Sequence, residues 1–495
     1  MLIRHTVAYL PAQLLSPLAQ FATALVLTFA LGPADYGLTL LIFASQELAF
    51  LLCLSWWTTF SLRYGSRLGL DAGSAGMARL ESAIVLLSCL AQMLATLLFI
   101  ALTQPEVAAS FYAAACAFTI TRSHLGFLSE RARREAAIGA YSMVQIAAPL
   151  GGLALTLALM QFGQPSPTGV LLVFALVQGA VGLAVAQRLG LLVRPAFRTQ
   201  TGGGLNAQVL RAAAHFGAPV VLSNLLSWVG GNGIRFVVLY GAGAAALGLM
   251  SVGWGLATRL SGVAAMLVAA AAYPLAVKAM DAGDAEGAKR QISDNSGLLL
   301  ALLAPCTLGL WVLCQPFVEL LVAQPYHAVT LQVLPWALLG ASIRNLRMHG
   351  WDQLYLLCEA PRAMVVLDAV EAVVTVLGAL IGLWWAGPGQ AVLGAVIGTT
   401  VAAALLAVGD WFYLRRRFGL HAPMGIYLRV LLAAAAMAAA LAAAPHLGWP
   451  VRANFGSLTL AAAAAALLYG AALAALFPGH SQRLAGWLRL RIAAK

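Results

Sequence analysis

Charged residues are scarce in this sequence. Asp, Glu, Lys and Arg together make up 9% of the 495 residues, whereas hydrophobic residues make up 62%. Soluble proteins carry roughly 25% charged residues, because their surfaces have to interact with water. So few charges cannot cover a water-facing surface, which excludes a soluble enzyme, a secreted scaffold and a disordered chain. We therefore expect an integral membrane protein.

Motifs for metal binding, disulfide frameworks and catalysis are also missing. The six cysteines show no CxxC spacing and lie in or beside apolar stretches, as small buried hydrophobic residues do. The eight histidines are scattered, and the sequence contains no metal-ligand spacing, no nucleophile elbow and no P-loop. We therefore predict no cofactor, no metal and no enzymatic activity. Any transport would draw on ion or voltage gradients, or on pull by the substrate.

Long apolar stretches dominate what is present. A membrane-spanning helix needs ~20 apolar residues, and the sequence contains about fourteen stretches of this kind. The loops between them are short, and the longest outer one, residues 316–328, is too small for an extramembrane domain. The predicted spans are residues 7–31, 38–61, 80–103, 107–127, 137–161, 168–188, 212–238, 246–276, 295–315, 329–357, 363–385, 390–413, 424–444 and 457–477.

The distribution of basic residues indicates the orientation. With the amino terminus inside, 24 of the 29 Lys and Arg residues fall in inner loops and tails, where we count Arg122 together with the arginines of residues 131–134. The outer loops hold one, Arg452. Cytoplasmic loops of membrane proteins collect Lys and Arg, so both termini are expected in the cytoplasm. The same bias explains the net charge of +12 without nucleic-acid binding.

An internal echo suggests two halves. Residues 32–38 and 243–249 both place a glycine five residues before a Gly-Leu pair, at an outer turn, 211 residues and six helices apart. Both copies start from the cytoplasmic side, so we predict a parallel repeat. The expected organisation is an N-lobe of helices 1–6 (residues 1–190), a cytoplasmic linker (191–211), a C-lobe of helices 7–12 (212–417), helices 13 and 14 (418–480), and an amphipathic cytoplasmic tail (481–495).

Several segments resemble a known family. Residues 5–10 (HTVAYL) and 31–37 (LGPADYG) are similar to the first hairpin of the Wzx-type polysaccharide flippases, which are bacterial transporters of the multidrug/oligosaccharidyl-lipid/polysaccharide exporter superfamily. Residues 219–252, the Tyr273-Pro274 step and residues 281–290 resemble the following segments of that family. Many members have an acidic residue directly before the position of Arg235, whereas this chain has Ile234.

The resemblance implies an all-helical fold of two six-helix lobes around a central cavity, with two extra helices at the end. It also implies alternating access that moves an undecaprenyl-pyrophosphate-linked oligosaccharide from the inner to the outer leaflet of the bacterial inner membrane. The product would serve lipopolysaccharide or exopolysaccharide assembly. The implied partners are this glycan, membrane lipids, H⁺ or Na⁺, and polysaccharide polymerase machinery. Two alternatives stay open: a cation-coupled multidrug exporter of the same superfamily, and a membrane polymerase or acyltransferase.

Charged side chains inside the predicted spans are the candidate site residues, because an ionised group at bilayer depth normally faces a cavity or a partner. Arg259 lies ~15 Å below the outer face and Glu47 lies ~14 Å below it. We expect Arg259 to hold a pyrophosphate with Glu47 as its resting partner; a static ion pair between the lobes is the alternative. Arg235, near the outer end of its helix, could bind substrate or reach the headgroups.

A second set lies on the tenth and eleventh predicted spans. Arg344 and Arg347 share one helix face, as do Asp368 and Glu371, and Arg347 and Glu371 have matching depths. We expect a salt bridge inside one lobe, and a carboxylate that responds to protons or sodium is the alternative. Asp352 completes the intramembrane acidic set, with Asp410 near the inner edge. Asn224 and Asn232 could bond sugar hydroxyls or join helices.

Overall fold

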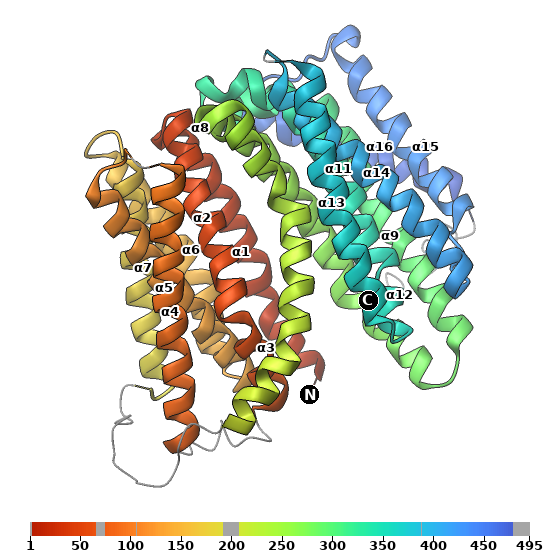
Figure 1. Cartoon of the computed structure of the whole chain (residues 1–495). Coiled ribbons are helices and arrows are strands. Elements are labelled where there is room, and N and C mark those ends of the chain that lie inside the picture. The colour runs from red at the N-terminus through yellow and green to blue at the C-terminus, as the bar shows by residue number, and fades with distance from the viewer. Residues whose placement is uncertain (1, 66–74, 105, 192–206, 388, 479–495) are drawn as a thin grey trace, which may run out of the picture. The chain divides into compact units, whose positions relative to one another are not determined.

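The computed structural model describes residues 2–65, 75–104, 106–191, 207–387 and 389–478. Within these ranges the chain is helical throughout and forms no strand (Figure 1). It divides into two compact units, Met1–Ser251 and Val252–Lys495, called unit 1 and unit 2 below. Most of the predicted linker and the predicted amphipathic tail lie outside the described residues.

Unit 1 contains the helices of the first half. Proline occupies the first turn of α2 and of α7, where its missing N–H costs no hydrogen bond. The Ser166 hydroxyl caps α7 by accepting a hydrogen bond from the Gly169 N–H at 3.1 Å. The helices are α1 (Leu2–Ala30), α2 (Pro33–Cys53), α3 (Ser55–Tyr64), α4 (Ala75–Thr103), α5 (Ala109–Arg134), α6 (Ile138–Met160), α7 (Pro167–Arg188) and the first segment of α8 (Ala207–Asp281).

The long helix α8 is interrupted at Gly243. This glycine has φ +89°, a conformation that side chains disfavour, so α8 consists of two segments, as the predicted spans 212–238 and 246–276 require. The two glycines of the internal echo, Gly37 and Gly248, meet in unit 1. A Cβ at Gly248 would lie 1.8 Å from the Pro33 carbonyl oxygen, and one at Gly37 would lie 2.4 Å from the Ala244 carbonyl oxygen. Only glycine allows this backbone contact.

Unit 2 contains the remaining helices. The predicted span 329–357 is not one regular helix, because a π-helical turn, η2 (Arg347–Trp351), separates α11 (His327–Leu346) from α12 (Gln353–Leu357). The predicted outer segment 316–328 is not irregular: most of the short helix α10 (Cys314–Leu321) and the 3₁₀ turn η1 (Gln324–Tyr326) lie there. The others are α9 (Ala285–Val312), α13 (Pro361–Ala386), α14 (Ala391–Phe418), α15 (Met424–Ala443), η3 (Ala444–Leu447) and α16 (Phe455–Leu476).

Helices α13 and α14 touch through their backbones. Gly378 and Gly382 on α13 face Gly394 and Gly398 on α14, and a Cβ at Gly382 would lie 2.0 Å from the Gly394 carbonyl oxygen. Both pairs have the GxxxG spacing that lets membrane helices approach closely. Apolar side chains beside this contact, among them Trp385, leave a groove of about 800 Å³ on the pair.

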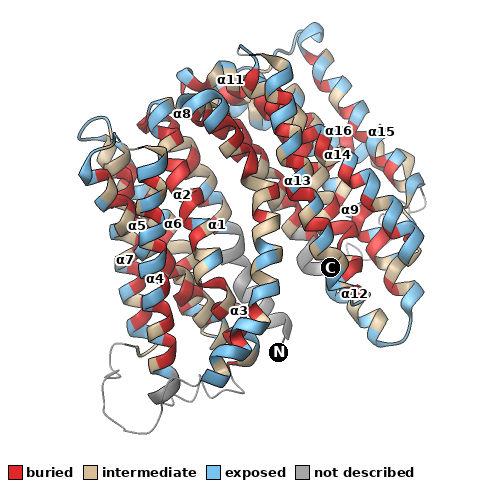
Figure 2. Cartoon of the chain, in the orientation of Figure 1, coloured by how far each residue is buried: buried red, intermediate tan, exposed pale blue. Residues whose placement is uncertain are grey.

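The described helices fit a multi-pass membrane protein. Ten of them are long and apolar enough to cross a membrane, and all fourteen predicted spans fall on helices. Exposed residues, pale blue in Figure 2, recur along helix α4. They include a row of leucines at Leu86, Leu90, Leu94, Leu98 and Leu102. Such a row, repeating every four residues along one helix face, is suited to lipid and would be unfavourable in water.

Candidate functional site

Among the described residues, unit 2 holds a group of four buried charged side chains and one half-exposed arginine, which we call the charge cluster: Arg347, Asp352, Glu371 and Asp410, with Arg344. At its centre, Glu371 of α13 accepts hydrogen bonds from Arg344 Nε (2.5 Å to Oε1) and from Arg347 Nη2 (to Oε2). Arg347 and Glu371 are each 2% exposed. The contact predicted between Arg347 and Glu371 is therefore confirmed, and Arg344 joins it.

The π-helical turn brings a second carboxylate to Arg347. Arg347 and Asp352 are five residues apart, a spacing that on a regular α-helix would point them to different faces. In η2 the wider turn brings Arg347 Nη1 to 3.6 Å from Asp352 Oδ2. The sequence could not reveal this contact, because nothing in its periodicity marks a π-helical turn.

Asp410 of α14 extends the charge cluster. Its Oδ1 accepts a hydrogen bond of 2.6 Å from the Tyr355 hydroxyl on α12. The carboxyl groups of Asp352 and Asp410 lie within hydrogen-bonding reach of each other. Asp368 is also buried, one turn before Glu371 on α13. The sequence identified all these acids as intramembrane, but not that Asp352 and Asp410 meet.

The other predicted site residues are distributed over both units. Arg259, half-exposed on the second segment of α8, donates from Nη1 to the Gly255 carbonyl oxygen at 3.1 Å. A Cβ at Gly255 would lie 2.7 Å from this nitrogen, so the glycine leaves room for the guanidinium. Arg235, Asn224 and Asn232 lie on the unit 1 segment of α8; Asn232 donates to the Trp228 carbonyl oxygen at 3.3 Å, and Asn224 is exposed.

Arg122 of unit 1, predicted to belong to an inner loop, lies inside a helix. Arg122, counted with the inner-loop residues, lies near the middle of α5, about 20 Å along the helix from Ala109. It is exposed, and it interacts electrostatically with the exposed Glu47 of α2. The signal was available, because Arg122 falls inside the predicted span 107–127. The predicted pairing of Glu47 with Arg259, which belongs to unit 2, stays a prediction.

Hydrogen bonds between neutral side chains fix the helices that carry Glu47 and Arg122. Gln46, next to Glu47, donates from Nε2 to the Ser123 hydroxyl at 3.0 Å, and Ser123, next to Arg122, donates to Gln92 Oε1 at 2.5 Å. All three side chains are buried. They tie α2, α4 and α5 together, so that Glu47 and Arg122 leave their helices at fixed positions. Exposed charges at this depth require water or an ionic partner, so we expect this face of unit 1 to be hydrated.

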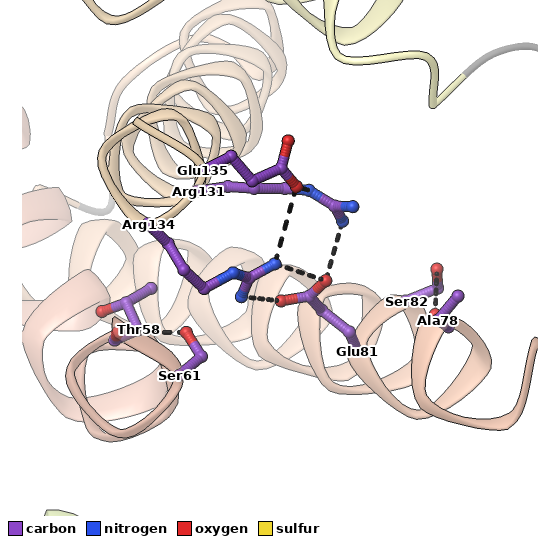
Figure 3. Close-up of polar contacts among 8 residues, drawn as sticks. All are labelled: Thr58, Ser61, Ala78, Glu81, Ser82, Arg131, Arg134 and Glu135. Atoms are coloured by element: carbon purple, nitrogen blue, oxygen red, sulfur yellow. Dashed lines mark hydrogen bonds and ion pairs between the residues drawn. The ribbon is translucent and has the colours of Figure 1, made fainter. Parts of the chain in front are cut away.

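A third group of ion pairs joins α4 to α5 and stabilises unit 1. Figure 3 shows Arg131 and Arg134 of α5 reaching toward Glu81 of α4, at distances of 2.7 and 2.8 Å. Glu81 is 3% exposed and both its carboxylate oxygens are engaged. Arg131 also contacts Glu135 at 2.9 Å. In the sequence these arginines indicate only orientation; that they bind a buried carboxylate becomes visible in the fold.

Metal binding finds no support in the described part of the chain, where no three His, Cys, Asp or Glu side chains are grouped to hold an ion. The accessible charged groups are instead suited to bind an anion, because guanidinium groups donate paired hydrogen bonds to phosphate or carboxylate. Arg122 and Arg259 are accessible in this way, whereas Arg347 is enclosed by its carboxylates.

Solved structures share this fold. The lipid II flippase MurJ in an inward closed conformation is similar with a TM-score of 0.70 and 11% identity, over 96% of this chain and 99% of that chain. A multidrug resistance MATE family transporter of the MOP superfamily, in an inward-facing conformation, is similar with a TM-score of 0.63 and 14% identity, over 82% of this chain and 94% of that one.

A MOP superfamily transporter from Pyrococcus furiosus is also similar, with a TM-score of 0.56 and 14% identity, over 84% of this chain and 95% of that one. The sequence itself matches no protein-family description and no curated protein. The chain therefore has the fold of MOP superfamily transporters, the superfamily to which the sequence resemblance points.

Proposed function

We propose that this protein is a flippase, which moves an undecaprenyl-pyrophosphate-linked oligosaccharide from the inner to the outer leaflet of the bacterial inner membrane by alternating access. Both chain termini then lie in the cytoplasm. The observation that carries the proposal is an accessible arginine inside a membrane helix of each unit: Arg122 on α5 and Arg259 on α8. Charged side chains are costly in lipid, so two accessible arginines at this depth favour an anionic substrate.

The extent of the structural similarity supports a flippase over a drug exporter. The lipid II flippase structure covers 96% of this chain, whereas the MATE and other MOP structures cover 82–84%. The uncovered share is close in length to the segment that follows α14. A cation-coupled multidrug exporter, the alternative in the same superfamily, would need acidic rather than arginine-containing faces for cationic drugs.

Arg122 and Arg259 are better placed to bind a pyrophosphate than the arginines of the charge cluster. Arg344 and Arg347 already engage Glu371, so a headgroup there would have to displace a buried carboxylate. The acid that acts electrostatically on Arg122 is the exposed Glu47, and a diphosphate could take its place without stranding a buried charge. Arg259 rests on the carbonyl of its own helix. We therefore assign a headgroup contact to Arg122 in unit 1 and, independently, one to Arg259 in unit 2, with Asn224, Asn232 and Arg235 of unit 1 as further contacts for the glycan.

Membrane voltage acts in the direction that the proposal requires. With the cytoplasm negative, outward movement of an anion gains about 2.3 kcal/mol per charge per 100 mV, if the whole potential is crossed. The arginines then only need to lower the barrier for the headgroup inside the membrane. Guanidinium can form two parallel hydrogen bonds to phosphate, which an ammonium group cannot reproduce in geometry.

The experiment is complementation of a deletion strain with variants of Arg259 and Arg122, read out by mass spectrometry of the polyprenyl-linked glycans that accumulate. Arg259→Ala should abolish export with the protein still inserted, Arg259→Lys should keep a fraction, and Arg259→Glu should be inactive. Arg122→Ala should behave like Arg259→Ala. Arg452→Ala, which removes an exposed arginine of an outer loop, is the matched control and should export normally.

Two results would argue against the proposal. Wild-type export by a well-inserted Arg259→Ala protein would remove Arg259 from the site and favour a packing role. Unchanged glycans in the deletion strain, together with increased sensitivity to cationic drugs, would favour the multidrug exporter.

A further inference from the structure

The charge cluster contains one more carboxylate than it has arginines. Glu371 takes one hydrogen bond from Arg344 and one from Arg347. The remaining acids, Asp352 and Asp410, then share the positive charge of Arg347, whose Nη1 is 3.6 Å from Asp352 Oδ2. If every acid were ionised, the cluster would carry a net negative charge while almost fully buried. Uncompensated charge of this kind is expensive away from water.

Two buried oxygen atoms indicate where the excess negative charge of the cluster is neutralised. Asp352 Oδ1 and Asp410 Oδ2 are buried, and among the described residues no ordinary donor hydrogen-bonds to either. Yet the two carboxyl groups are within hydrogen-bonding reach of each other. Two ionised carboxylates repel each other, and neither can donate a hydrogen bond. They can form a hydrogen bond to each other only when one of them carries a proton.

The groups around Asp352 and Asp410 favour a proton over a metal ion as the cation bound between them. The charged or titratable groups that act on the pair are Arg347 of η2, Glu371 of α13 and Tyr355 of α12. Helices α9 and α15 contribute neutral groups to Trp351, the residue before Asp352: Trp351 Nε1 donates to the Tyr427 hydroxyl of α15 at 2.9 Å, and this hydroxyl is 2.5 Å from that of Ser296 on α9. Two carboxyl groups and one phenol supply few oxygens for a metal ion, which commonly takes six or more.

We propose that Asp352 and Asp410 form a proton-binding site of unit 2, which holds one shared proton in the conformation seen here. The site itself is independent of the transported substrate; its use in coupling rests on the proposed flippase function. Release of the proton would leave two repelling carboxylates beside the π-helical turn. The turn could respond by reverting to α-helical geometry, which rotates Asp352 away from Arg347. Proton binding would thereby be linked to the shape of the segment that joins α11 to α12.

Infrared spectroscopy of the purified full-length protein tests the site without any transport assay. At pH 7 the wild type should show one protonated carboxyl band that shifts in D₂O. The band should disappear in Asp352→Asn and in Asp410→Asn, because an asparagine amide can donate to the remaining carboxylate without a shared proton. Asp294→Asn, an exposed position on α9, is the matched control and should retain the band. Wild type without the band, or both variants with it, would overturn the proposal.

Stability provides the second measurement. The unfolded chain holds both aspartates ionised above about pH 5, so the folded protein binds one proton more. The unfolding equilibrium constant should then rise tenfold per pH unit in the wild type, up to the pH at which the pair ionises. Each Asn variant should lose this slope. Stability that follows sodium concentration in place of pH would identify a sodium site and refute the proton.

The two proposals fail separately. A protonated carboxyl band together with normal glycan export by Arg259→Ala would refute the flippase site and keep the proton site. Absence of the band together with loss of export in Arg259→Ala would do the reverse. The wild-type band needs no variant, so the test stands even if one asparagine substitution prevents folding.

Discussion

Removing the charge of Glu371 should destabilise unit 2 strongly. Glu371→Gln keeps the size of the side chain but leaves Arg347, 2% exposed, without its hydrogen-bonded anion. Breaking a buried ion pair by removing one partner costs about 3–5 kcal/mol, because the remaining charge stays buried; Asp352, 3.6 Å from Arg347, offsets only part of this cost. Arg344 is 28% exposed and can turn to water, so its contribution is smaller. At about 2–4 °C per kcal/mol for a unit of this size, the melting temperature should fall by about 6–20 °C.

The assay is thermal unfolding of the purified protein in detergent, with the yield of folded protein as a second readout. Glu286→Gln is the matched control, because it makes the same substitution in a surface pair with Lys289 and should change stability by less than about 0.5 kcal/mol. Exchanging the charges of Arg347 and Glu371 should restore part of the loss. If Glu371→Gln folds and melts normally but loses transport and its pH dependence, the structural interpretation is wrong and Glu371 has a coupling role.

Three further predictions address other parts of the molecule. Glu81→Gln should also lower the melting temperature, since the buried Arg134 side chain then loses its 2.8 Å ion pair and keeps the longer one with Glu135, 3.9 Å away; an unchanged melting curve would mean that Glu135 is a sufficient partner. Gly248→Val should prevent folding, as seen by size-exclusion chromatography, whereas Gly32→Ala, with open space around it, should be tolerated; normal Gly248→Val protein would contradict the backbone contact. Reporter fusions after Gln390 should lie outside and those after Arg417 inside, and an inside signal at Gln390 would break the predicted topology.

The positions of the helices could be predicted because a membrane imposes one simple requirement. A span needs ~20 apolar residues, so each spanning helix can be recognised from its own sequence, without knowledge of the helices around it. The interruptions inside spans follow no such rule. The π-helical turn at Arg347–Trp351 and the short helix α10 depend on packing within unit 2, and the sequence offers no local signal for either.

The site was predictable where depth alone decides a contact. Arg347 and Glu371 lie at equal distances from the same membrane face on consecutive spans, which was enough to pair them. Asp352 and Asp410 required the π-helical turn, which depth does not indicate. Arg122 was missed for a different reason: sorting basic residues by loop placed it at a helix end, although its own span contains it.

The glycine contact between α13 and α14 bears on how the chain is made. The two helices follow each other directly in the sequence, and they meet through Gly382 and Gly394 without help from distant side chains. A nascent chain could therefore pair them in the bilayer as soon as α14 leaves the ribosome and inserts, before α15 and α16 are synthesised. Contacts between neighbours in sequence form fastest, because little chain entropy is lost. The pair would then form a preassembled hairpin within unit 2, against which α15 and α16 are added later.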